Sequence, residues 1–153
     1  MAILPHEFYP SIFEPACANA TLTERLCARA GRVLAWDGSA EAITRARRRL
    51  AKNTKVQLAC KTVPDHWPMT SMDLVVLSDF LYYLPKERVV HVAELASRSI
   101  GLVGTIVACH WRGSAHDFLM PGGDAVHTLL TESLGTPAIS YLDDRHVLDV
   151  WTR

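Results

Sequence analysis

Carboxylate and imidazole side chains follow four short apolar runs of this 153-residue chain. Glu14 and Asp37 end the first two runs, and Asp79 and His110 follow two later ones. Carboxylates bind hydroxyl or ammonium groups, and either side-chain type can take a proton during catalysis. Asp37 lies about twenty residues beyond the loop of small residues after Glu14, a spacing that lets one carboxylate accept both hydroxyls of a bound ribose. The alternative is that Asp37 only caps the helix that follows.

The elements that must position these groups alternate along the chain. Ser39 is expected to cap the second helix and Gly31 to end the first, because serine and glycine favour those positions. Strands are predicted over residues 11–14, 32–36, 55–60, 73–77, 102–110, 138–142 and 146–151, and helices from 22 to Gly31 and over 40–52, 85–99 and 121–134.

This alternation predicts an α/β fold of the Rossmann-like type, with a mostly parallel sheet and helices on both faces. Only Asp143-Asp144-Arg145 separates the last two strands, so they are expected to form an antiparallel β-hairpin at the sheet edge. Ligands of such sheets bind at the carboxyl ends of the strands. The chemistry-bearing residues therefore meet along one edge.

Composition limits the partners. Sixteen basic and sixteen acidic residues give a net charge of zero, which provides no broad field for nucleic acid or for an anionic membrane. No apolar run reaches the ~20 residues of a membrane span. The four cysteines lie far apart, as expected for reduced thiols in a cytoplasmic protein. A single domain over residues 1–153 is expected, with residues 1–10 as an N-terminal stub.

Several longer segments together resemble one family. The chain from about Ile12 is similar to the class I S-adenosylmethionine-dependent methyltransferases, and within them to the nodulation-protein-S-like (NodS-like) group. That resemblance implies a seven-stranded sheet, S-adenosylmethionine as cofactor and S-adenosylhomocysteine as product. The segments that carry it are Glu14-Pro-Ala-Cys17, Asp37-Gly-Ser39, Val63-Pro-Asp-His-Trp-Pro68, Asp73–Leu84 with its Tyr82-Tyr83 pair, Val107–Arg112, Gly123–His127 and Val147–Trp151.

The resemblance also implies roles for residues at the strand ends. Cofactor contacts are expected from Glu14, Ala16, Cys17, Ala18, Asp37, Gly38, Ser39, Val63, Asp65 and Ser78. The catalytic candidates are Asp79 and His110, and the acceptor-binding candidates are Tyr82, Tyr83, Trp111 and Arg112. Alternatives stay open: Asp79 binds the amino-acid part of the cofactor or caps a turn, one tyrosine belongs to the core, and Arg112 forms an ordinary salt bridge.

The chain departs from the family pattern at two places. Alanine stands at positions 16, 18 and 20, where the family uses glycine, and Asn19 is expected to take the left-handed backbone conformation. The segment before the first strand is shorter than in the family. An inactive methyltransferase-like domain that binds a partner is therefore an alternative function, and a second copy or a partner chain is expected to cover the open N-terminal side.

The function expected is methyl transfer to nitrogen or oxygen of a small polar acceptor, such as an amino sugar or glycoconjugate. No metal is expected, because the candidate ligands lack tight spacing. The basic segment from Arg45 to Lys52 is interpreted as a solvated helix face. A nicotinamide-dependent oxidoreductase is disfavoured because the G-x-G-x-x-G motif is absent. The metal-ligand candidates considered are His110, His116, Asp117, Asp124 and His127.

Overall fold

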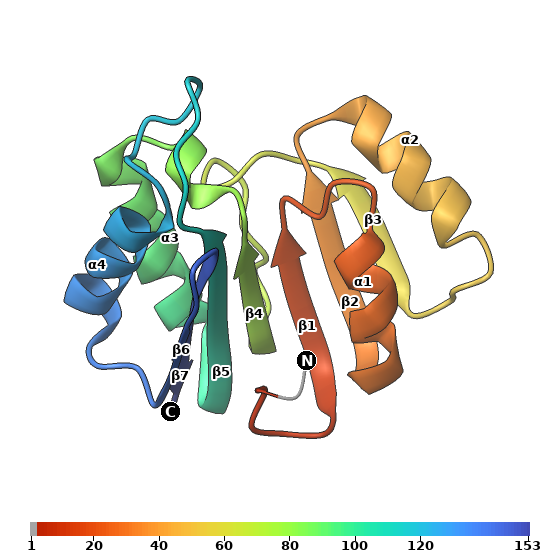
Figure 1. Cartoon of the computed structure of the whole chain (residues 1–153). Helices are drawn as coiled ribbons and strands as arrows, with labels where there is room; N and C mark the ends of the chain where they lie inside the picture. The colour runs from red at the N-terminus through yellow and green to blue at the C-terminus, as the bar shows by residue number, and fades with distance from the viewer. Residues whose placement is uncertain (1–2) are drawn as a thin grey trace.

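The computed structural model describes residues 3–153 and shows a central sheet with helices on both faces (Figure 1). Residues 1–2 of the predicted stub lie outside the described residues. The strands are β1 (Tyr9–Pro15), β2 (Ala30–Asp37), β3 (Val56–Cys60), β4 (Met72–Ser78), β5 (Ile100–Trp111), β6 (Ile139–Leu142) and β7 (His146–Thr152). The helices are α1 (Thr21–Leu26), α2 (Ala40–Arg49), α3 (Lys86–Ser99) and α4 (Gly123–Leu134), with 3₁₀ turns η1 (Cys27–Arg29) and η2 (Leu81–Tyr83).

The seven strands are ordered β3-β2-β1-β4-β5-β7-β6. The first five are parallel, and β7 pairs antiparallel with both β5 and β6. The predicted fold class and the closing hairpin are confirmed, and β7 inserts between β5 and the edge strand β6. The strand order reverses between β1 and β4, which is where open α/β sheets bind ligands.

Ser39 caps α2 as predicted, because its hydroxyl oxygen accepts a hydrogen bond from the backbone N–H of Ala42 at 3.2 Å. The prediction for Gly31 is wrong. Helix α1 ends at Leu26, and Gly31 lies inside β2. A Cβ atom at Gly31 would lie 2.6 Å from the carbonyl oxygen of Pro10. Glycine is therefore required by the close approach of β1 and β2, not by a helix end.

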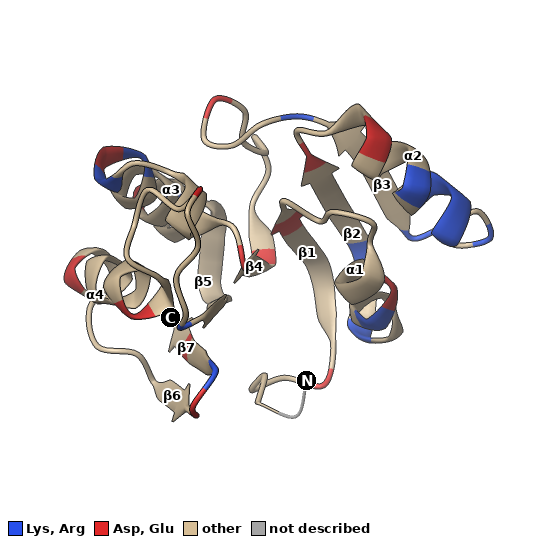
Figure 2. Ribbon diagram, turned by 45° about the horizontal axis from the view of Figure 1, so that its top comes forward, with Lys and Arg blue, Asp and Glu red and all other residues tan. Residues whose placement is uncertain are grey.

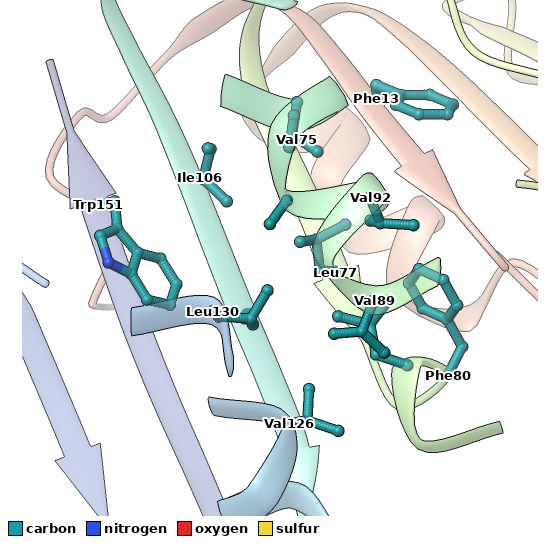
Figure 3. Close-up of a cluster of buried hydrophobic side chains, with 14 of the residues drawn as sticks. Phe13, Val75, Leu77, Phe80, Val89, Val92, Ile106, Val126, Leu130 and Trp151 are labelled. Carbon is teal, nitrogen blue, oxygen red and sulfur yellow. The ribbon is translucent and has the colours of Figure 1, made fainter. Parts of the chain in front are cut away.

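The apolar residues of the strands are buried on both faces of the sheet. Figure 3 shows the larger cluster, where Val75 and Ile106 of the sheet meet α3 and α4 through Val92 and Leu130. A second cluster on the opposite face includes Ile12. With both faces filled, polar groups collect at the strand ends, and Figure 2 shows acidic positions at the carboxyl ends of β1, β2 and β4.

Candidate active site

The loop that leaves β1 has an unusual backbone for its residue types. Ala16, Ala18 and Ala20 have φ angles of 57°, 48° and 63°, in the left-handed region that favours glycine. We call residues 16–20 the alanine loop. The prediction that Asn19 takes the left-handed conformation is wrong. Its side-chain oxygen instead accepts the Thr21 hydroxyl hydrogen bond at 2.7 Å. The loop thus has, at three alanines, a backbone conformation that favours glycine.

Asp37 at the end of β2 fastens this loop. Its Oδ2 accepts a hydrogen bond from the Ala18 backbone N–H at 2.9 Å, and its Oδ1 accepts one from the Ser39 N–H at 2.8 Å. Each carboxylate oxygen has two acceptor sites, so both oxygens can accept a further hydrogen bond. The Ser39 side chain, and not Asp37, caps α2. The Asp37 carboxylate therefore has acceptor capacity left for the two hydroxyls of a vicinal diol.

Glu14 at the end of β1 is a buried acid, only 3 % exposed. Its Oε2 and the Thr23 hydroxyl are both buried without a hydrogen-bond partner among the described residues. Burial raises the pKa of Glu14 to about 7, and the nearby Thr23 hydroxyl acts in the opposite direction. A cationic partner would stabilise the charged form of this buried carboxylate, which has no hydrogen-bond partner on Oε2 among the described residues.

Cys17, three residues after Glu14, is also buried. Burial and the charges of Glu14 and Asp37 raise the pKa of its thiol to about 12. Cys17 therefore stays a neutral, unreactive thiol that packs into the second hydrophobic cluster.

The remaining predicted cofactor residues lie in the segments that follow β2 and β3 and at the end of β4. A Cβ atom at Gly38 would lie 2.7 Å from Cγ2 of Thr62, so the absence of a side chain lets the segment after β3 approach. Val63 in that segment packs against the larger core cluster. Asp65 forms an exposed ion pair with Arg88 at 2.8 Å, and that hydrogen bond lowers the pKa of Asp65. Ser78 borders a hollow of about 250 Å³ beside the ends of β4 and β5.

Asp79 links the carboxyl ends of β4 and β5. Its Oδ1 accepts hydrogen bonds from the Tyr82 hydroxyl at 3.0 Å and from the Trp111 backbone N–H at 2.9 Å. Its own N–H donates to the Cys109 carbonyl oxygen at 2.9 Å, and its φ of 52° is left-handed. Burial and the neighbouring Asp79 raise the pKa of Tyr82, which stays a neutral hydrogen-bond donor. Asp79 itself is exposed.

Aromatic rings pack together next to Tyr82, which holds this carboxylate. Tyr82 stacks on Phe118 with centroids 3.9 Å apart, and Tyr83 and Trp111 meet Phe118 edge-on at 5.0 and 6.2 Å. Tyr82 is buried, whereas Tyr83 and Trp111 are 46 % and 37 % exposed. We call these four residues the aromatic cluster. Phe118 was missed in the sequence because it lies in an irregular segment with no pattern to place it.

His110 lies beneath the aromatic cluster and is fully buried. Its Nε2 accepts a hydrogen bond from the Leu81 N–H at 3.4 Å, and its Nδ1 lies 3.1 Å from Nε2 of His127. Burial and the neighbouring His127 hold the pKa of His110 well below its usual range. Both ring nitrogens are occupied, so this geometry leaves none for an acceptor molecule.

Arg112 is engaged by other residues. It forms a two-pronged ion pair with Asp124, with nitrogen–oxygen distances of 2.9 and 3.1 Å, and donates to the Asp143 carbonyl oxygen at 2.6 Å. The Asp124 hydrogen bond raises the pKa of Arg112. The structure thus shows the salt bridge that the sequence left as an alternative to acceptor binding.

A family model described as "Methyltransferase domain" matches residues 12–100, more than half of the chain. The chain belongs to this methyltransferase family. The methyltransferase is similar over 99 % of its length to a putative methyltransferase from Pseudomonas syringae, with 33 % identity, a TM-score of 0.87 and 92 % of that chain covered. A search of curated proteins gave no match.

The same fold occurs in the N-methyltransferase NodS from Bradyrhizobium japonicum WM9, solved with S-adenosylhomocysteine. There the identity is 21 % and the TM-score 0.81, over 95 % of this chain and 79 % of that one. A protein from Pyrococcus horikoshii OT3 also shares the fold, with 14 % identity and a TM-score of 0.78 over 99 % of this chain and 84 % of that one.

The cofactor of the methyltransferase family is S-adenosylmethionine. Two features of this structure fit this cofactor. The Asp37 carboxylate can still accept hydrogen bonds from hydroxyl groups. The buried Oε2 of Glu14 has no hydrogen-bond partner among the described residues and can pair with a cationic group. Residues 3–153 contain no group of three or more His, Cys, Asp or Glu placed to hold a metal ion. Within the same range, no helix has the length and hydropathy of a membrane span.

Proposed function

We propose that this methyltransferase transfers a methyl group to the amine nitrogen of a small polar acceptor, such as an amino sugar. The observation that carries the proposal is the exposed Asp79 carboxylate, which is fixed by Tyr82 and the Trp111 amide. Tyr82 belongs to the aromatic cluster, in which Tyr83 and Trp111 are exposed. A carboxylate attracts an ammonium ion, and aromatic faces attract the same cation. An amine therefore suits this place.

A hydroxyl acceptor suits the site less well. A hydroxyl must lose its proton to become a good nucleophile, and this requires a well-placed base. His110 meets the Tyr82 ring of the aromatic cluster, but both its nitrogens are occupied. An amine needs only to release its proton to solvent before attack, and the exposed position of Asp79 allows this. NodS, which shares this fold, is an N-methyltransferase, and this is compatible with an amine acceptor.

The ends of β1 and β2 would bind different parts of the cofactor. Asp37 would accept the ribose hydroxyls and Glu14 would pair with the ammonium group, and Gly38, Ser39, Val63 and Asp65 would border the nucleoside. S-adenosylmethionine supplies, when bound, a methyl group on a positively charged sulfur. Because methyl transfer is an in-line displacement, the main task of these residues is to align donor and acceptor.

A matched pair of acceptors tests the proposal. The purified chain is incubated with methyl-labelled S-adenosylmethionine and either glucosamine or glucose, which differ in one amine. The expected result is label on glucosamine alone, and a loss of labelling in Asp79→Asn. Labelling of glucose alone, or undiminished labelling by Asp79→Asn, contradicts an amine held by Asp79.

Other expectations about partners stay proposals of the same kind. We expect a small-molecule acceptor without nucleic acid or membrane, and association with a second copy or partner chain on the open N-terminal side. The alternative function, an inactive methyltransferase-like domain, draws no support from the comparisons.

A further inference from the structure

A chain of hydrogen bonds, buried except at its outer end, runs from the edge strand β6 to the turn η2. The Leu81 N–H donates to Nε2 of His110, whose Nδ1 lies 3.1 Å from Nε2 of His127. Nδ1 of His127 lies 2.6 Å from Oδ2 of Asp149, and the Ser140 hydroxyl donates to Oδ1 of the same carboxylate. We call these five residues the histidine chain. Its two rings and the Asp149 carboxylate are all buried.

The hydrogen bonds fix where the protons lie. A backbone N–H can only donate, so Nε2 of His110 must be an acceptor and the proton of the neutral ring lies on Nδ1. That proton is donated to Nε2 of His127, which places the His127 proton on Nδ1, facing Asp149. Burial lowers the pKa of both rings, although Asp149 opposes this for His127. Both rings are therefore neutral with the proton on Nδ1.

The inner end of the histidine chain supports the proposed acceptor site. Leu81 begins η2, and the next residue, Tyr82, donates its hydroxyl hydrogen bond to Asp79. The Tyr82 ring meets His110 edge-on with centroids 5.5 Å apart. The Tyr82 carbonyl oxygen accepts hydrogen bonds from the N–H groups of Leu119 and Met120, at 2.8 and 3.1 Å. His110 and the segment after β5 thus hold Tyr82 from two sides.

The chain is assembled from elements that lie far apart in the sequence. His110 is on β5, His127 on α4 and Asp149 on β7, and Figure 1 shows α4 beside these strands. Buried polar groups are costly to bring together, and apolar residues of similar size commonly stabilise a core as well or better. The presence of His110, His127 and Asp149 beside the site is explained if they hold the turn η2 in one arrangement.

We propose that His110, His127 and Asp149 are positioning residues that hold η2 so that Tyr82 fixes the Asp79 carboxylate for the acceptor amine. The proposal rests on the proposed function and deepens it. The Leu81 N–H at one end and the Asp149 carboxylate, as a hydrogen-bond acceptor, at the other end both require this proton order. If that order were reversed, Nε2 of His110 would carry a proton against the Leu81 N–H, and the turn would lose its anchor.

The first test uses the unmodified protein. Long-range ¹H–¹⁵N spectra at pH 7 report which ring nitrogen of each histidine is protonated. The expected result is a neutral ring with the proton on Nδ1 for both His110 and His127. A charged ring, or a proton on Nε2 of either residue, overturns the proposal.

The second test is Asp149→Asn, which keeps the size of the side chain but can donate to His127 and reverse the proton order. We expect kcat to fall roughly 10- to 100-fold, the cost of a small misplacement at a reacting centre, with S-adenosylhomocysteine affinity within twofold. Asp73→Asn is the matched control. Asp73 also accepts a serine hydroxyl hydrogen bond, from Ser11 at 2.6 Å, but in a different part of the sheet. Equal kcat values for the two variants overturn the proposal.

The proposal can be tested even if the proposed function fails. If the unmodified protein methylates no amine, exchange of the Leu81 amide hydrogen replaces kcat as the measured quantity. We expect Asp149→Asn to speed this exchange at least tenfold relative to Asp73→Asn, with circular dichroism confirming that both variants are folded. Equal exchange rates overturn the positioning role.

Discussion

Replacing Ala18 with glycine should stabilise the protein, because Ala18 has a left-handed φ of 48° and an exposed side chain. The left-handed conformation costs an L-residue roughly 1–2 kcal/mol. Glycine loses about 0.4–1 kcal/mol more than alanine through the entropy of the unfolded chain. The difference predicts a gain of about 0.5–1 kcal/mol in the free energy of unfolding, or a rise of about 1–4 °C in Tm for a domain of this size.

Two matched variants separate backbone strain from lost packing. Ala20 has a φ of 63° but is fully buried in a cluster with Ala46 and Leu50. Loss of its methyl group costs about 0.8 kcal/mol, so Ala20→Gly should be close to neutral. Ala28 is exposed in η1 without a positive φ, and Ala28→Gly should lose about 0.5–1 kcal/mol.

Equilibrium urea unfolding measures all three variants, and equal m-values allow the midpoints to be compared. The predicted order of stability is Ala18→Gly above the unmodified protein, Ala20→Gly near it and Ala28→Gly below it. If Ala18→Gly loses as much stability as Ala28→Gly, the alanine loop stores no backbone strain and the reasoning is refuted.

Three further variants test the site and the sheet. Glu14→Gln should remove a pH dependence: the pKa of Glu14 is raised to about 7 in the fold, so the unmodified protein loses stability, up to about 3 kcal/mol, as pH rises from 5 to 8. Urea midpoints at both pH values check this, and an equal loss in both proteins contradicts it. Asp79→Asn should lower kcat about 100-fold without changing S-adenosylhomocysteine affinity measured by calorimetry; reduced affinity would instead place Asp79 at the cofactor. Gly31→Ala should lower the free energy of unfolding by about 1–3 kcal/mol, because its Cβ would lie 2.6 Å from the Pro10 carbonyl oxygen; an unchanged urea midpoint refutes that contact.

The elements were predictable because their signals are local. The apolar run before Ser78 is typical of a strand buried on both faces, and Ser39 caps α2 through a residue three positions away. The short Asp143-Asp144-Arg145 connection was enough to predict the antiparallel hairpin. Gly31 was misassigned because its requirement is not local. Only the neighbouring strand, with the Pro10 carbonyl oxygen, shows why a side chain is excluded there.

The candidate site was predictable only in part, for the same reason. Asp37 and Asp79 follow strands, so their place at the sheet edge follows from the strand pattern. The partners of His110 could not be foreseen. Whether a histidine at a strand end is exposed or buried depends on what α4 and β7 place against it. The sequence grouped His127 with His110 only as a candidate metal ligand and did not link Asp149 to either residue. The sequence also placed the left-handed backbone on Asn19, because the propensity of asparagine does not show that the loop imposes it on three alanines.

The central claim, that Asp37 and the alanine loop form the cofactor site, is tested most directly by calorimetric titration with S-adenosylhomocysteine. The account predicts saturable binding with one site per chain. Asp37→Ala should weaken this binding at least about tenfold, since hydrogen bonds to a charged group contribute roughly 1.5–3 kcal/mol. Asp144→Ala, an exposed substitution in the hairpin turn, should leave the affinity unchanged. An absence of saturable binding, or equal affinity in Asp37→Ala and the unmodified protein, would contradict the account.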